Sequence, residues 1–196
     1  MTDLSQLYDP PSDLARNKQL AHLDDHARNF IALSPFLVIA SGGVDGADCS
    51  PRGDAPGFVQ VLDAQTLLIP DRRGNNRLDT LQNVQARPEI GLLFFVPGIN
   101  ETLRINGRAE IVSDAALLAP LAAQGKIPGT ALRVIVTQMY FHCGKALLRS
   151  KLWQPESQVP RSAFPSLGRV IADQVQGVDG AQADIYLEES YKNRLY

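Results

Sequence analysis

The sequence predicts a mainly β or α+β fold: an antiparallel barrel of about six short strands, flanked by a few helices. Short apolar segments are separated by turns rich in glycine and proline. No G-x-G-x-x-G motif follows a strand and no P-loop motif occurs, which disfavours a doubly wound nucleotide-binding sheet. With 196 residues, 44% of them hydrophobic, the chain can bury a substantial core, and we expect one domain.

The first part of the chain predicts a helix followed by paired strands. Ser12 follows two prolines and is suited to cap a helix whose apolar stripe runs on to Ile31, with an end near Ser34-Pro35. The next predicted element is a hairpin of residues 36–41 with 49–52 across a glycine-rich connection at 42–48. Two further strands are predicted at 58–62 and 66–69, and a helix at 75–86.

The segment 102–111 gives the clearest strand signal because its polar and apolar residues alternate. The pattern predicts a packed face of Leu103, Ile105, Gly107, Ala109 and Ile111, and a polar face of Thr102, Arg104, Asn106, Arg108 and Glu110. The remaining predicted elements are strands 90–96 and 132–143, a short helix capped by Asp114, helices 144–153 and 167–175, and a polar tail.

Composition excludes several classes of protein. The formal net charge is -2 and the pI is near 5.9, so a nucleic-acid binder that works through general basicity is not expected. Cys49 and Cys143 lack any C-x-x-C spacing, and we expect both to be reduced and buried. The chain starts without a basic segment leading into an apolar one and has no run of about 18 apolar residues, so we expect a soluble cytoplasmic protein with no membrane contact.

The segment 71–77, Asp-Arg-Arg-Gly-Asn-Asn-Arg, lies between an apolar strand and the predicted helix. A helix N-terminus offers unpaired N–H groups and partial positive charge, and arginine adds a fork that matches phosphate oxygens. The segment therefore indicates a phosphate site. The alternative is an ordinary basic turn whose arginines are solvated or pair with Asp71 and Asp79.

Three further polar groups each allow two interpretations. Residues 50–54, Ser-Pro-Arg-Gly-Asp, could approach the same anion or form a turn closed by an Asp54 to Arg52 pair. The polar face of segment 102–111 could line a cleft or face water. The basic patch Lys145, Arg149, Lys151 and Trp153 could border a ligand or merely cap a helix.

The histidines are candidates for metal or acid–base chemistry, although a structural role is favoured for His142 and a solvated helix face for the other two. His142 has no second histidine or carboxylate at ligand spacing. His22 and His26 are four residues apart on the predicted helix, but polar neighbours favour a solvated face.

Taken together, these segments resemble the pyridoxamine 5'-phosphate oxidase-like FMN-binding family. The resemblance is carried by residues 50–54, then by 68–77, then by Gly-Leu-Leu-Phe at 91–94 with Glu-Thr-Leu-Arg-Ile-Asn-Gly at 101–107. Residues 142–153 resemble the FMN-dependent branch of that family whose substrates are uncharacterised. The match covers roughly residues 10–155.

The resemblance implies a split β-barrel in which two subunits bind two FMN molecules across their interface. We expect an N-terminal helical arm at 1–35, the barrel at 36–155 and a loop and helix extension of the same domain at 156–196. Arg72 and Arg73 would hold the FMN phosphate, Ser50 and Arg52 would approach the ribityl chain and ring, and Lys145, Arg149 and Trp153 would come from the other subunit. The cofactor-binding residues expected are Ser50, Arg52, Gly53, Asp71, Arg72, Arg73, Asn75, Asn76, Arg77, Arg104, Lys145, Arg149 and Trp153.

Two departures from the family pattern restrict the expected activity. The chain ends Asn193-Arg194-Leu195-Tyr196, without the histidine of the Arg-Leu-His substrate motif, so oxidation of vitamin B6 is not expected. The strand 59–62 lacks the family's Arg-x-x-Leu-Leu-Lys charges, which leaves the phosphate to the arginine cluster. No catalytic residue and no metal ligand is assigned.

The sequence thus favours a homodimeric FMN-dependent oxidoreductase that acts on an unidentified small molecule, with flavin performing the electron transfer. Two alternatives stay open. One is a flavin-binding or flavin-storage protein without turnover, and the other is a haem-binding split barrel with His142 or His22 as the axial ligand.

Overall fold

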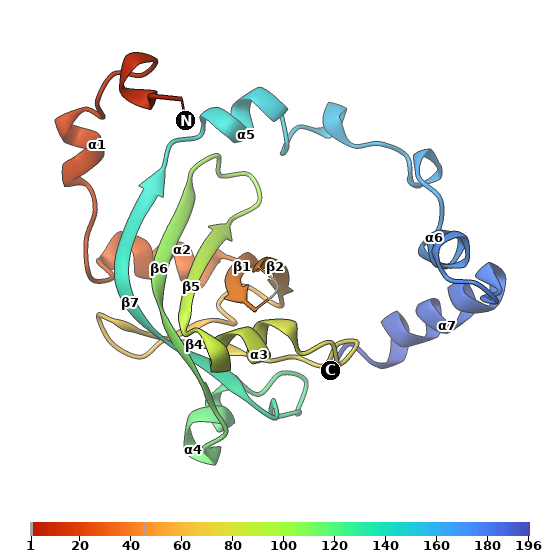
Figure 1. The fold of residues 1–196 in the computed structure, drawn as a ribbon. Helices are drawn as coiled ribbons and strands as arrows, with labels where there is room; N and C mark the ends of the chain where they lie inside the picture. The colour runs from red at the N-terminus through yellow and green to blue at the C-terminus, as the bar shows by residue number, and fades with distance from the viewer. Residues whose placement is uncertain (1, 45) are drawn as a thin grey trace.

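The computed structural model describes residues 2–44 and 46–196. Its centre is one antiparallel sheet of seven strands in the order β2-β1-β5-β6-β7-β4-β3 (Figure 1). The sheet curls, so that β4 crosses the lower end of the long strands β6 and β7 (Figure 1). The strands are β1 (Phe36–Gly43), β2 (Gly46–Gly53), β3 (Gln60–Val61), β4 (Thr66–Pro70), β5 (Glu89–Phe95), β6 (Thr102–Val112) and β7 (Ala131–His142).

The strand pairs agree with the sequence pattern, with small differences. The predicted hairpin at 36–52 is β1 with β2, paired from Phe36 with Gly53 to Gly43 with Gly46. The strands extend farther into the glycine-rich connection than expected, and residue 45 of that connection lies outside the described residues. The predicted strands 58–62 and 66–69 are β3 and β4, which pair with each other, but β3 is shorter than expected.

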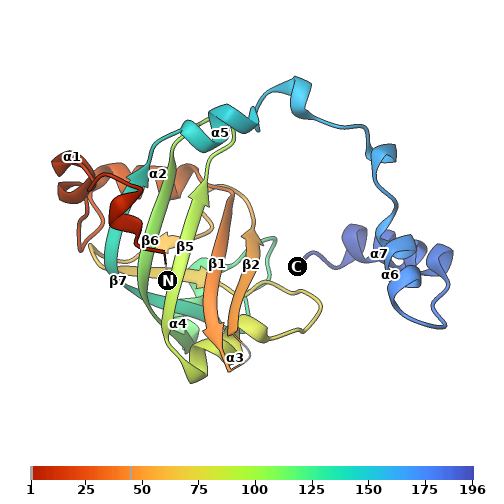
Figure 2. The same cartoon turned by 45° about the horizontal axis from the view of Figure 1, so that its top comes forward.

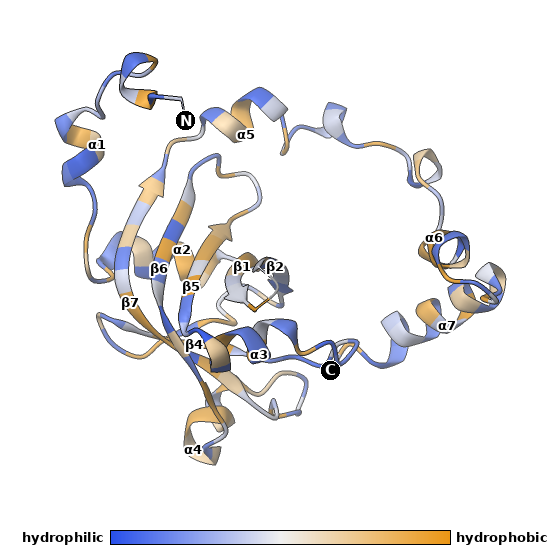
Figure 3. Ribbon diagram, in the orientation of Figure 1, coloured by the Kyte–Doolittle hydropathy of each residue, from blue (hydrophilic) through white to orange (hydrophobic). Residues whose placement is uncertain are grey.

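The alternation in β6 places its apolar face in the core. Leu103 and Ile105 are fully buried and Ala109 is nearly so, while Arg104, Arg108 and Glu110 are exposed. Thr102 is an exception: it is buried, not on an open polar face as predicted. The strands accordingly carry alternating apolar and polar colours along the sheet (Figure 3).

Gly107 allows β6 and β7 to pass closely where their register shifts between Asn106 and Gly107. A Cβ at this position would lie 2.5 Å from the carbonyl oxygen of Ile135. Only glycine leaves room for that backbone, so the local bend of the sheet depends on this residue.

The N-terminal segment forms two helices instead of the single long helix predicted. Ser12 caps α1 (Asp13–Asn17) as expected, and Asp24 caps α2 (Asp25–Leu33). The chain between them is extended because the Leu20 N–H donates to the Met139 carbonyl (2.9 Å) and the Met139 N–H donates to the Leu20 carbonyl (2.7 Å). Tertiary pairing with β7 therefore replaces helix at residues 18–24.

The helices α3 (Asp79–Ala86) and α4 (Ala115–Leu118) lie near the lower end of the sheet (Figure 1). Asp114 caps α4 as predicted. α3 begins at Asp79, not at residue 75, and residues 71–78 form a loop. The basic segment is therefore a loop ahead of the helix and not its first turn.

After β7 the chain forms α5 (Lys145–Ser150) and then leaves the barrel. We call residues 151–196 the C-terminal arm. It contains two 3-10 turns (Pro155–Ser157 and Arg161–Ala163), α6 (Leu167–Gln174) and α7 (Gly180–Asn193). α7 shows that most of the expected polar tail is helical. Figure 2 shows the arm arching away from the sheet and α7 leading back to the C-terminus.

Both cysteines are free, but both are exposed, which corrects the expectation of burial. Over the part of the chain that the structure describes, no helix has the length and apolar character needed to span a bilayer.

Candidate functional site

A cavity of about 670 Å³ opens where β2, β4 and the loop 71–78 meet. Ligand pockets in proteins commonly have volumes of about 300–1,000 Å³. Its basic walls come from Arg52, Arg72, Arg73, Arg77 and Lys126, and its other polar side chains are Asp71, Asn75, Asn76 and Tyr196. Phe58, Ile127 and several prolines add apolar surface. The cavity suits a ligand that carries both an anion and an apolar or aromatic part.

Arg72 is held firmly at the back of this cavity. Its Nε donates to the Asp54 carboxylate at 2.6 Å, and its Nη1 donates to the Leu121 carbonyl at 2.8 Å. The Tyr196 hydroxyl donates to the other oxygen of the same carboxylate at 2.6 Å. Asp54 therefore pairs with Arg72. The alternative interpretation, a turn closed by an ion pair between Asp54 and Arg52, is wrong.

The Asp54 carboxyl is deeply buried, with a side-chain exposure of 3%. Burial by itself raises its pKa, but the hydrogen bonds from Tyr196 and from the Ala55 N–H, together with Arg72, outweigh burial and hold the pKa below its ordinary value. The same contact raises the pKa of the Tyr196 phenol. Asp54 is thus a carboxylate whose charge organises two groups of the cavity wall.

The other cations are less constrained. Arg52 lies 3.9 Å from Asp71, and the exposed Arg77 pairs with Asp79 at 2.9 Å. Arg73 is exposed at the cavity and forms no ion pair with any residue that the structure describes. Lys126 donates to the backbone oxygen of Tyr196 at 2.8 Å. Arg73 is therefore the cation most available to a bound anion.

Asp71 places a carboxylate among these cations. Burial raises its pKa, and the Arg52 charge opposes that rise only in part. A carboxylate beside a bound phosphate is repulsive, but it accepts hydrogen bonds from hydroxyl groups. Asp71 therefore suits a polyol section of a ligand better than its phosphate.

The structure brings together eight of the predicted cofactor-binding residues at this cavity: Arg52, Gly53, Asp71, Arg72, Arg73, Asn75, Asn76 and Arg77. Ser50 lies two residues from Arg52 on the same face of β2, but it does not line the cavity, and its hydroxyl bonds to Asp48 at 3.3 Å.

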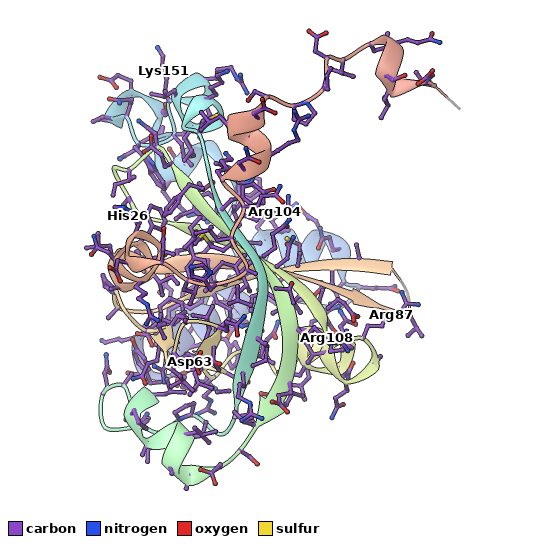
Figure 4. The ribbon with its side chains drawn as sticks, turned by 90° about the vertical axis from the view of Figure 1, so that its left-hand side faces the viewer. His26, Asp63, Arg87, Arg104, Arg108 and Lys151 are labelled. Carbon is purple, nitrogen blue, oxygen red and sulfur yellow. The ribbon has the colours of Figure 1, made fainter. Side chains whose placement is uncertain are left out.

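Four predicted residues lie elsewhere within one chain. Arg104 projects from β6 onto the outer face of the sheet, on the same strand as Arg108 (Figure 4). Lys145 and Arg149 are exposed on α5, and the Trp153 indole N–H donates to the Ile99 carbonyl at 2.8 Å. The indole thus anchors the start of the C-terminal arm.

Sequence reasoning missed Lys126 and Tyr196 as parts of the site, and it placed Asp54 in the 50–54 cluster without finding its partners Arg72 and Tyr196. Lys126 lies in the connection before β7 and Tyr196 is 142 residues from its partner Asp54. No local pattern marks such residues. The sequence offered one general signal: an acidic residue close to a basic cluster is a candidate ion-pair partner for it, which applies to Asp54.

The histidines do not join a cluster of metal-ligating side chains in the described part of the chain. Among the residues that the structure describes, no group of three or more histidine, cysteine or acidic side chains is placed to hold an ion. His142 is half-buried on β7, and burial, followed by the charges of Arg104 and Lys18, lowers its pKa. His22 and His26 are exposed.

Comparison with known proteins identifies the fold. The family model for pyridoxamine 5'-phosphate oxidase matches residues 23–143, more than half of the chain. The structure of HupZ from Group A Streptococcus superposes with a TM-score of 0.50 at 17% identity, covering 61% of this chain and 93% of HupZ. An FMN-binding protein from Syntrophomonas wolfei subsp. wolfei has a TM-score of 0.47 at 8% identity, covering 60% and 84%. General stress protein 26 from Bacillus anthracis str. Sterne has a TM-score of 0.43 at 14% identity, covering 59% and 93%.

No curated protein matches the chain by sequence. The family match spans the sheet from α2 to the end of β7, which includes Arg52 and all of the loop 71–78. The likeness to HupZ at this identity supports the fold alone. The chain therefore belongs to the pyridoxamine 5'-phosphate oxidase-like family of FMN-binding split barrels.

Proposed function

We propose that this chain binds FMN in the cavity at β2, β4 and the loop 71–78, and that it is an FMN-dependent oxidoreductase for a small molecule. The observation that supports this best is the donor set of the cavity. Four arginines and Lys126 line a volume suited to a cofactor, and Arg73 carries a charge without an ion-pair partner among the described residues. A phosphate monoester fits such a site because guanidinium groups bind its oxygens in pairs.

The charge of each side chain indicates which part of FMN it would bind. Arg73 and Lys126 would bind the phosphate, with Arg72 adding positive charge from behind. Asp71, Asn75 and Asn76 would accept hydrogen bonds from the ribityl hydroxyls. Arg52 on β2 would donate to the polar edge of the ring, where it stabilises negative charge. Bound flavin supplies electron transfer, while these side chains bind and orient it.

We further propose that the protein acts as a homodimer. On the outer face of the sheet, Phe36 and Val38 of β1 lie beside Phe95 and Leu93 of β5, and all four side chains are at least partly exposed. The Phe36 and Phe95 rings lie 6.1 Å apart. An apolar group of this kind on an open sheet face favours association. Arg104 pairs across from Leu93, so a second copy on this face is needed to bring it near a cofactor.

Titration with FMN, followed by flavin fluorescence and absorption, tests the proposal. Saturable binding with one FMN per chain is expected, and Arg73→Ala should weaken it. A carrier and an enzyme are then separated by adding reduced nicotinamide without oxygen: bleaching that reverses in air indicates turnover. Persistent flavin colour with every donor tried would favour the storage protein, and absence of FMN binding would reject the proposal.

A further inference from the structure

The C-terminal arm returns to the barrel at a single residue. Trp153 anchors its start through the Ile99 carbonyl, and Tyr196 contacts Asp54 and Lys126 at its end. Over the described residues 154–195, no hydrogen bond or ion pair reaches the barrel. α6 and α7 pack on each other instead, where the Asp184 carboxylate accepts from the Gly168 N–H at 2.8 Å. Tyr196 therefore fastens the far end of an arm whose described residues 154–195 make no hydrogen bond or ion pair to the barrel, and Figure 2 shows this arm arching away from the sheet.

Tyr196 also touches two of the cavity's cations. Its hydroxyl donates to the same Asp54 carboxylate that binds Arg72. The guanidinium carbon of Arg72 lies over the Tyr196 ring, 5.8 Å from the ring centre. Its backbone oxygen accepts from Lys126. Tyr196 itself lines the cavity. One residue of the arm thus fixes the position of both cations.

These contacts leave both cations able to bind an anion. Arg72 uses Nε and Nη1 for Asp54 and Leu121, so its Nη2 donors are not consumed by these bonds. Lys126 has three donors and uses one for Tyr196. Holding a flexible cation in its bound position lowers the entropy cost of binding.

We infer that Tyr196 is a positioning residue for the phosphate of the cofactor, and that docking of the C-terminal arm and binding of FMN favour each other. The inference rests on the proposed function, because it takes the ligand to be FMN. Linkage requires the effect to be mutual: if the docked arm strengthens FMN binding, FMN strengthens docking of the arm by the same factor.

The test compares Tyr196→Phe with the wild-type protein and with Tyr191→Phe. Tyr191 is an exposed tyrosine of the same arm, so it provides a matched control for the loss of a hydroxyl. Each protein is titrated with FMN and with riboflavin, which has the same ring and ribityl chain but no phosphate. We expect Tyr196→Phe to bind FMN roughly three- to tenfold more weakly, as the loss of one hydrogen bond predicts, with riboflavin binding unchanged.

Digestion with trypsin in the absence of flavin measures docking of the arm separately, since Arg161 and Arg169 are exposed cleavage sites on it. Cleavage there should be faster in Tyr196→Phe than in Tyr191→Phe, and FMN should slow it in the wild-type protein.

Equal FMN affinity in the two variants, or equal loss for FMN and riboflavin, overturns the inference and leaves the proposed function standing. Tighter FMN binding in Tyr196→Phe also overturns it, because the tyrosine would then be an obstacle. A wild-type protein that binds no FMN overturns the proposed function and, with it, the coupling.

Discussion

Replacement of Arg72 by alanine should destabilise the protein, even though Arg72 lies at a ligand cavity. Its partner Asp54 has a side-chain exposure of only 3%, and Arg72 itself has 16%. Removing one member of a buried ion pair costs about 3–5 kcal/mol when the other charge is left without compensation. Asp54 keeps its hydrogen bonds from Tyr196 and Ala55, so we expect a smaller loss of about 2–3 kcal/mol in the free energy of unfolding. For a chain of this size, that lowers Tm by roughly 5–10 °C.

Urea unfolding followed by circular dichroism measures this loss, with Arg73→Ala as the control. Arg73 is exposed and has no ion pair among the described residues, so its replacement should change stability by less than about 0.5 kcal/mol. Equal unfolding midpoints for the two variants would show that the pair with Asp54 contributes nothing.

The pH dependence gives a second check on the same pair. The folded pKa of Asp54 lies below its ordinary value of 3.8, so its contribution to stability is complete above that pH and is lost as pH falls through the folded pKa. The stability difference between wild type and Arg72→Ala should therefore be largest near neutral pH and shrink below about pH 4. A difference that stays constant into acid would contradict the assignment of the charge to Asp54.

Three further outcomes follow from single positions. Arg73→Ala should weaken FMN binding about tenfold or more, as loss of a charge-assisted hydrogen bond predicts, while riboflavin titration stays the same. Gly107→Ala should cost about 1–3 kcal/mol in urea unfolding because its Cβ would lie 2.5 Å from the Ile135 oxygen, whereas Gly42→Ala, which meets nothing within 4 Å, serves as control. Ile105→Ala should cost about 2–5 kcal/mol because the side chain is fully buried, and a midpoint equal to that of wild type would contradict its place in the core.

Much of the sheet could be predicted because its signals are local. The alternation of polar and apolar residues along β6 predicted which side chains are buried and which are exposed, with Thr102 as the exception. Ser12 and Asp114 cap the helices that follow them, since the capping bond joins residues only a few positions apart. The loop 71–78 was recognised as basic from its own residues, and the structure places it at the cavity.

Other expectations failed where distant segments decide the outcome. Local propensity favoured one helix up to Ile31, but the backbone bonds between Leu20 and Met139 break it. The apolar residues of the C-terminal arm gave too little periodicity to reveal α7, whose described residues are not buried.

The amino-acid sequence by itself determined the strand pattern, the helix caps and the charge of the loop that faces the cavity, because these depend on neighbours within a few residues. Only the tertiary structure decided how those charges are used. It joined Arg72 to Asp54 and brought Tyr196 to the same carboxylate across 142 residues, while Arg73 was left exposed. Adjacent arginines have equal chemistry in a sequence, and their different roles arise from burial and from partners that the chain supplies only after folding.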